Sequence, residues 1–96
     1  MAEKVVWMSK AKEDYREIIS YLLDKWSFEV ADRFTTQIDD VIELLKVHHY
    51  LGAVSGRLTS LTKITIQPHY TLYYLFVEDM ICVVNILDNR QKPQLI

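Results

Sequence analysis

A histidine and a tyrosine stand side by side in the second half of the chain, at the start of an apolar run. His69 and Tyr70 follow Pro68, so they belong to a turn and to the first position of a strand. A histidine beside a phenol could serve as a general base and acid. An ordinary turn histidine next to a packed strand tyrosine has the same pattern, so both interpretations stay open.

Basic residues are few in this half of the chain, and they are the other candidates for chemistry. They are Arg57, Lys63, Arg90 and Lys92. Lys63 falls in a predicted strand and Arg90 just beyond another, so in an antiparallel sheet the two could converge on one concave surface. There they could bind phosphate or the carboxylates of a partner. The candidate catalytic residues are therefore Lys63, His69, Tyr70 and Arg90.

Tyr73 and Tyr74 occupy neighbouring positions of one strand, so one faces the helices and the other faces away. An outward tyrosine near basic residues could stack on a base. The predicted partner-binding set combines four cations with one such tyrosine: Arg57, Lys63, Tyr74, Arg90 and Lys92.

Metal and cofactor sites lack the residues they would need. His48 and His49 are adjacent and point in different directions, and no third or fourth ligand follows at a useful spacing. The chain has no phosphate-cradling glycine-rich loop and no Ser/His/Asp or Cys/His set at a recognisable spacing. We predict neither a metal nor a cofactor, and we interpret the carboxylates of the predicted helices as facing solvent.

Length and charge narrow the classes of function. The 96 residues make one domain, 1–96, and 50% of them are apolar or aromatic, which suits a small dense core. A net charge of −2 does not provide the dense basic patch typical of nucleic-acid binding. No apolar run approaches the roughly 20 residues of a membrane span, and no signal-peptide pattern is present. We therefore predict a cytoplasmic protein without membrane contact.

Two stretches of the first half have the periodicity of amphipathic helices. In residues 10–25 apolar side chains recur every three or four positions as far as Trp26, with Ser9 as the cap. Residues 28–47 continue this period, with Ser27 as the cap. Helices joined by so short a connection should pack as an antiparallel hairpin. Six of their apolar residues are expected to be buried: Ile18, Leu22, Phe34, Ile38, Val41 and Leu45.

The rest of the chain has strand-like patterns. After a loop at 48–60, three β-type runs are separated by Pro68 and by a tight turn at Glu78-Asp79, which predicts an antiparallel meander. These runs are 61–66, 70–77 and 80–87, and a further short strand at 4–8 precedes the helices. The expected fold is α+β, a two-layer sandwich of order β-α-α-β-β-β, with the helix hairpin packed on a small, mainly antiparallel sheet.

Five segments taken in order resemble the RelE/ParE toxin superfamily, whose members are often described as plasmid-stabilisation proteins. The segments are Trp7-Met-Ser-Lys-Ala-Lys-Glu-Asp-Tyr15, Tyr21 to Trp26, Ala31-Asp-Arg-Phe34, Pro68-His-Tyr-Thr-Leu-Tyr-Tyr74 and Ile86-Leu-Asp-Asn-Arg-Gln-Lys-Pro93. The resemblance covers nearly the whole chain. It implies the same order of elements and a cognate antitoxin that wraps the toxin. It also implies one of two activities: RelE-like members cut mRNA in the ribosomal A site, and ParE-like members poison DNA gyrase without cutting RNA.

The RelE-like cleavage pattern can be compared position by position. It implies basic residues on the first meander strand, where Lys63 is the candidate, and an arginine just past the last strand, where Arg90 matches. It also implies an arginine directly after Tyr70, where this chain has Thr71, and a later tyrosine where it has Ile96. Such groups would stabilise a developing phosphorane and move the proton.

The sequence therefore favours a ParE-like toxin that has no RNase activity, inhibits DNA gyrase and is neutralised by an antitoxin. One alternative is a ribosome-dependent mRNA endonuclease that works through Lys63, Arg90 and either His69 or Tyr70. The other is a decayed family member that keeps the fold and a partner without toxicity. Without its antitoxin the chain is expected to expose apolar surface and to form a homodimer.

Overall fold

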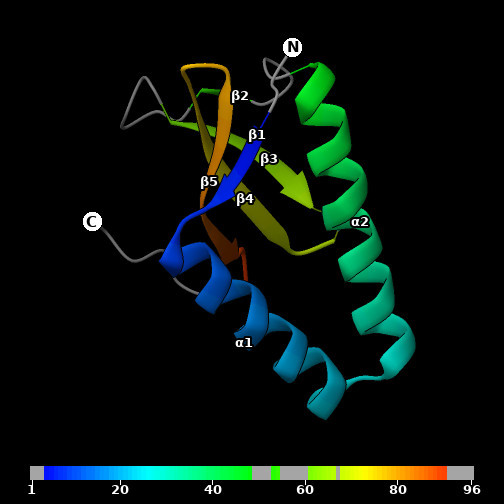
Figure 1. Cartoon of the computed structure of the whole chain (residues 1–96). Coiled ribbons are helices and arrows are strands. Elements are labelled where there is room, and N and C mark those ends of the chain that lie inside the picture. Colours follow the sequence, from blue (N-terminus) through cyan, green and yellow to red (C-terminus); the bar gives the residue numbers. More distant parts are fainter. Residues whose placement is uncertain (1–3, 49–52, 55–60, 67, 91–96) are drawn as a thin grey trace.

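The computed structural model of the chain describes residues 4–48, 53–54, 61–66 and 68–90. The predicted order of elements is confirmed, with one addition: a two-residue strand lies inside the segment expected to be a loop (Figure 1). The other six elements begin and end within one residue of the predicted bounds. The elements are β1 (Lys4–Trp7), α1 (Ser9–Lys25), α2 (Phe28–Val47), β2 (Ala53–Val54), β3 (Thr62–Ile66), β4 (Tyr70–Val77) and β5 (Met80–Asp88).

The five strands form one mixed sheet in the order β1-β5-β4-β3-β2. The meander from β2 to β5 is antiparallel, as predicted for the main part of the sheet. The first strand pairs in parallel with the last, from Lys4 opposite Met80 to Trp7 opposite Val83. A parallel pair needs a long crossover connection, and here the connection includes the helix hairpin.

The core lies between the two helices and the face of the sheet that they cover. Four of the six residues predicted to be buried are so: Leu22, Phe34, Ile38 and Leu45, each at most 4% exposed. The other two, Ile18 and Val41, are half-buried and pack against the edge of the core. The sheet contributes a matching set of buried side chains: Ile66, Tyr70, Leu72, Tyr74, Ile81, Val83 and Ile86.

The two predicted helix caps differ in outcome. Ser27 caps α2 as predicted, because its hydroxyl accepts a hydrogen bond from the Val30 amide at 3.2 Å. Ser9 is not the cap of α1. It is the first helical residue, and Met8 holds the cap position without a side-chain hydrogen bond. The Met8 amide donates to the carbonyl of Val83 at 2.9 Å, so β1 runs directly into the helix.

A β-bulge in β5 determines how α1 meets the sheet. Tyr73 lies opposite Asn85 while Tyr74 lies opposite Val83, so β5 has one extra residue there. Beyond the bulge the amide of Ile86 donates to the Asp14 carboxylate of α1 at 3.0 Å. The prediction that the helix carboxylates face solvent is wrong for Asp14, which is only 6% exposed.

Candidate functional site

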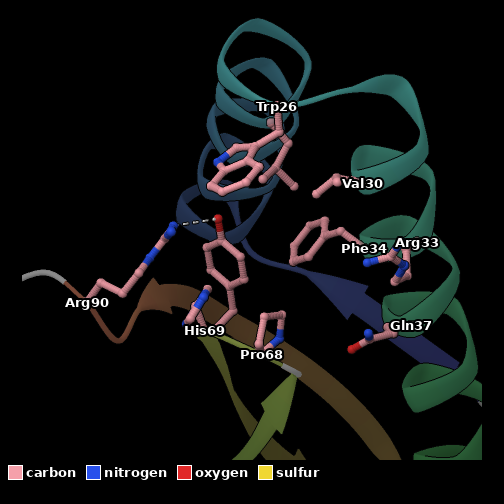
Figure 2. A pocket seen from close by; sticks show the side chains of 10 residues that line it. Trp26, Val30, Arg33, Phe34, Gln37, Pro68, His69 and Arg90 are labelled. Carbon is pink, nitrogen blue, oxygen red and sulfur yellow. Dashed lines mark hydrogen bonds between the residues drawn. The ribbon is translucent and has the colours of Figure 1, made fainter.

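A pocket of about 180 Å³ lies between the tip of the helix hairpin and the end of the sheet where β4 begins (Figure 2). The helices supply its apolar side through Leu22, Trp26, Val30 and Phe34. Leu22 and Phe34 are each 4% exposed and belong to the core, whereas Trp26 is 61% exposed. The pocket therefore has a rigid floor and an aromatic side chain at its rim.

Polar groups surround this apolar floor. Arg33 and Gln37 come from α2, His69 comes from the β3–β4 turn, and Arg90 follows β5. Figure 2 shows Arg90 on the side opposite Arg33 and Gln37. The pocket thus presents two guanidinium groups to a ligand from opposite sides.

Arg90 is held in place by several contacts. Its Nε donates to Asp88 Oδ1 at 3.0 Å and its Nη2 donates to Asp88 Oδ2 at 2.9 Å, a two-point pairing with the carboxylate. Its Nη2 also donates to the Tyr70 hydroxyl at 3.3 Å. Its guanidinium carbon lies 5.8 Å from the ring centre of Tyr21 and 5.8 Å from that of Tyr70.

These contacts change the acidity of both partners. The hydrogen bonds from Arg90 lower the pKa of the Asp88 carboxyl, and the hydrogen bond to Asp88 raises the pKa of the guanidinium. Burial raises the pKa of the Tyr70 phenol, against the lowering effect of Arg90. Tyr70 therefore remains a neutral phenol in the physiological range, and the Asp88–Arg90 pair remains ionised.

A line of aromatic rings runs from β1 to the pocket. The ring centres of Trp7 and Tyr15 are 5.2 Å apart, those of Tyr15 and Phe34 are 6.0 Å apart, and those of Phe34 and Tyr70 are 5.0 Å apart. These distances are typical of favourable tilted or edge-to-face pairs. The line connects α1 and α2 to β4 through the floor of the pocket and fixes the position of Tyr70.

The structure brings together three of the four candidate catalytic residues. His69, Tyr70 and Arg90 all line the pocket. Lys63 does not join them, because it lies opposite Tyr73 in the β3–β4 register, one position out of phase with the buried Tyr70, Leu72 and Tyr74. Its side chain is exposed on the face of the sheet away from the helices. Lys63 and Arg90 therefore do not converge on one surface.

His69 and Tyr70 do not form an acid–base pair within the described residues. The Tyr70 hydroxyl accepts its hydrogen bond from Arg90, and His69 is exposed in the turn. The carbonyl of His69 accepts from the Asn89 amide at 2.6 Å, which fixes the turn against the end of β5. This arrangement fits the second interpretation of the sequence, an ordinary turn histidine next to a packed strand tyrosine.

Thr71 is the residue that stands where the RelE-like pattern implies an arginine. It is 8% exposed, and its hydroxyl donates to the Asn89 side chain at 2.7 Å. At this position a neutral, hydrogen-bonded pair of side chains therefore links β4 to the residues after β5.

The predicted partner-binding residues have different locations. Tyr74 was assigned to the surface, and this is wrong: it is 0% exposed, because its position in β4 faces the helices. Tyr73 is the outward tyrosine and is half-buried. Arg57 and Lys92 lie outside the described residues. Lys63 is exposed and Arg90 lines the pocket, as described above.

Sequence reasoning missed two residues of the pocket rim. Trp26 was placed on the buried stripe of α1, but the helix ends at Lys25 and Trp26 is the cap residue, so no following turn covers it. Arg33 is exposed on α2, and nothing in the sequence pattern indicated that it lines the pocket. A large aromatic residue at a helix end was the signal that could have found this site.

A second, more open hollow of about 360 Å³ lies near the start of α1, and Trp7, Lys12, Tyr15, Arg16 and Asp39 line it. Over the described ranges, no three His, Cys, Asp or Glu side chains come together in a way that could hold a metal ion. Within the same ranges, neither helix has the length and apolar content that crossing a membrane requires.

The sequence model of the ParE toxin of type II toxin–antitoxin system, parDE, matches residues 5–93. The matched range includes every described residue of the pocket and all seven elements except Lys4, the first residue of β1. A comparison with curated protein sequences gives no match.

Several solved structures are similar to this chain in fold. A chain of the chromosomal ParDE TA system from P. aeruginosa superposes with a TM-score of 0.73 at 15% identity, over 88% of this chain and 94% of that one. A YoeB/ParE toxin from Agrobacterium tumefaciens gives 0.65 at 16% identity, over 88% and 96%. A chain of a YoeB-YefM complex from Staphylococcus aureus gives 0.61 at 15%, over 85% and 91%. At this level of identity the likeness shows the fold alone.

Proposed function

Because this chain belongs to the family of ParE toxins of type II toxin–antitoxin systems, we propose that it inhibits DNA gyrase without cutting RNA and that a cognate antitoxin neutralises it. The family assignment covers residues 5–93. The choice of gyrase over the ribosome depends on the residues that would otherwise cleave RNA.

The placement of three residues carries the non-enzymatic interpretation. Arg90 is paired at two points with Asp88, Thr71 offers a neutral buried hydroxyl, and Lys63 lies on the other face of the sheet. Phosphodiester cleavage needs cations and a proton carrier held in one constellation, and losing one such group typically costs orders of magnitude in rate. Binding to a protein target requires only a surface of complementary charge and shape, which these residues can provide.

The antitoxin partner is supported by the family and by the solved relatives, one of which is a YoeB-YefM toxin–antitoxin heterotetramer from Staphylococcus aureus. In this chain we place the antitoxin over the helix hairpin and the sheet. The exposed apolar side chains at the hairpin tip support this placement, since Leu23, Trp26 and Phe28 are 50%, 61% and 72% exposed. The complex would form in the cytoplasm, and without antitoxin this surface would favour a homodimer.

The direct test incubates the purified chain with programmed ribosomes and, separately, with gyrase and supercoiled DNA. We expect gyrase inhibition with intact mRNA. Codon-specific A-site cuts that disappear in Arg90→Ala would refute the proposal and establish the endonuclease. Inactivity in both assays, despite a normal unfolding transition, would identify a decayed toxin.

The partner is tested by looking for a small open reading frame immediately upstream of this gene and co-expressing its product with the chain. The two products should purify as one complex, and growth should recover. If the upstream product neither binds nor restores growth, the toxin–antitoxin role is refuted.

A further inference from the structure

The pocket at the hairpin tip has the size of a single large side chain. Dry protein cavities of roughly 150 Å³ lined by Leu, Ile and Phe bind benzene, and this pocket measures about 180 Å³. Its floor, Leu22 and Phe34, is almost fully buried and belongs to the packed core. A leucine, isoleucine or phenylalanine from another molecule would fit between this floor and the indole of Trp26.

The charges at the rim have one sign. Among the described residues, Arg33 and Arg90 line the pocket and no carboxylate does. Only one of these guanidinium groups is available to pair with a ligand. Arg90 is already paired with Asp88, whereas Arg33 has no ion pair or hydrogen bond with any residue in the described part of the chain. An exposed guanidinium beside an apolar pocket favours a ligand that carries an apolar group and an anion together.

We propose that this pocket holds one large apolar side chain of the antitoxin, and that an antitoxin carboxylate close to that side chain pairs with Arg33. The inference rests on the proposed function, since it assumes the antitoxin as partner. It adds the anchoring position, the chemistry of the occupant and the two residues that select it, Val30 by volume and Arg33 by charge. The exposed Trp26 at the rim would shield the anchor from water, as neutral contacts around an interface anchor do.

The test measures the affinity of the upstream-encoded antitoxin for the full chain and three variants by titration calorimetry. Val30→Trp fills the half-buried side of the pocket and should weaken binding at least about 30-fold, as the loss of an interface anchor does. Arg33→Glu should weaken binding about tenfold and flatten its dependence on salt. Lys12→Glu is the matched control, because it reverses an exposed cation near the start of α1, outside the lining of the pocket, and should weaken binding less than Arg33→Glu does.

A fluorescence readout separates a blocked pocket from a misfolded variant. The chain has two tryptophans, so Trp7→Phe leaves Trp26 as the reporter, and for this readout Val30→Phe replaces Val30→Trp, which would add a tryptophan. On binding, the emission of Trp26 should move to shorter wavelength and its quenching by acrylamide should fall. Each variant must also keep the unfolding midpoint of the parent chain, and if Val30→Trp loses it, Val30→Phe replaces that variant as the pocket-filling change.

The outcomes distinguish the inference from the proposed function. A complex that tolerates both Val30→Trp and Arg33→Glu, with Trp26 emission unchanged, overturns the pocket as the anchoring site and leaves the toxin–antitoxin role intact. The chain could instead self-associate without antitoxin, and Val30→Trp could abolish this association while antitoxin binding persists. That result would identify a second copy of the chain as the occupant and overturn the inference. Absence of any complex refutes the proposed function and the inference together.

Discussion

Replacing Asp14 with alanine tests whether a single carboxylate holds α1 against the edge of the sheet. Strand β1 ends at Trp7, so β5 continues beyond the point where β1 can pair with it. There the Asp14 carboxylate replaces β1 as a hydrogen-bond partner of β5. One of its oxygens accepts a hydrogen bond from the Ile86 amide at 3.0 Å, and the other accepts one from the Lys10 ammonium. Asp14→Ala would leave the Ile86 amide buried without a partner.

The magnitude follows from the burial of each group. An unsatisfied buried amide costs about 1–3 kcal/mol. The Lys10 contact adds less than about 1 kcal/mol, since the lysine side chain is 62% exposed and the pair is screened by water. The higher helix propensity of alanine offsets at most about 0.7 kcal/mol of this loss of stability. The net loss should be about 2 kcal/mol, or a fall in Tm of roughly 8–16 °C for a domain of this size.

Two further variants show which property of the carboxylate matters. Asp14→Asn keeps an acceptor oxygen for the Ile86 amide and should lose less than half as much stability as the alanine variant. Glu17→Ala removes an exposed carboxylate from the same helix and should stay within about 0.5 kcal/mol of the parent. Urea unfolding gives the free energies, and hydrogen exchange gives the protection of the Ile86 amide. If Asp14→Ala unfolds like Glu17→Ala, or the Ile86 amide keeps its protection, the assigned role of Asp14 is wrong.

Three other changes test the core, a turn and the Asp88–Arg90 pair. Phe34→Ala should cost about 3–5 kcal/mol, since Phe34 is 4% exposed, and a urea-derived loss below about 1 kcal/mol would contradict its core position. Glu78 and Asp79 both have positive φ, 49° and 62°, as a type I′ turn requires, so Asp79→Gly should raise stability by about 0.5–1 kcal/mol; a lower Tm would disprove the strain. Because Arg90 lowers the pKa of Asp88 below 3.8, the pair adds stability above that pH and loses it as the pH falls through the lower folded-state pKa. Asp88→Asn should therefore flatten the acid limb of the stability curve below pH 3.8, and an unchanged limb counts against the pairing.

The sequence was sufficient wherever local periodicity decides the structure. The bounds of α2 and β4 are those predicted. An apolar side chain every three or four positions indicates a helix, and a continuous apolar run between Pro68 and the turn at Glu78-Asp79 indicates a strand. The short connection between the helices and the turn at Glu78-Asp79 likewise follow from local chemistry.

The remaining features depend on contacts between distant segments, which local patterns do not encode. Tyr73 and Tyr74 are identical side chains in an apolar strand, and only the helices determine which of them is buried. Asp14 has the same charge as its exposed neighbour Glu13, and its burial depends on a β-bulge 70 positions away at residues 83–85. The pocket depends on such contacts too, because Trp26 and Arg90 come to line one cavity only through the fold.

The parallel pairing of β1 with β5 has a consequence for the order in which this toxin becomes active. The ribosome releases β1 and the helix hairpin first, but residues 80–83, which β1 must join, follow more than 70 positions later. Until then α1 lacks β5, the strand against which it packs, since non-local strand pairing comes late in folding. During synthesis the amphipathic hairpin is therefore exposed before the strand that completes its packing has been made.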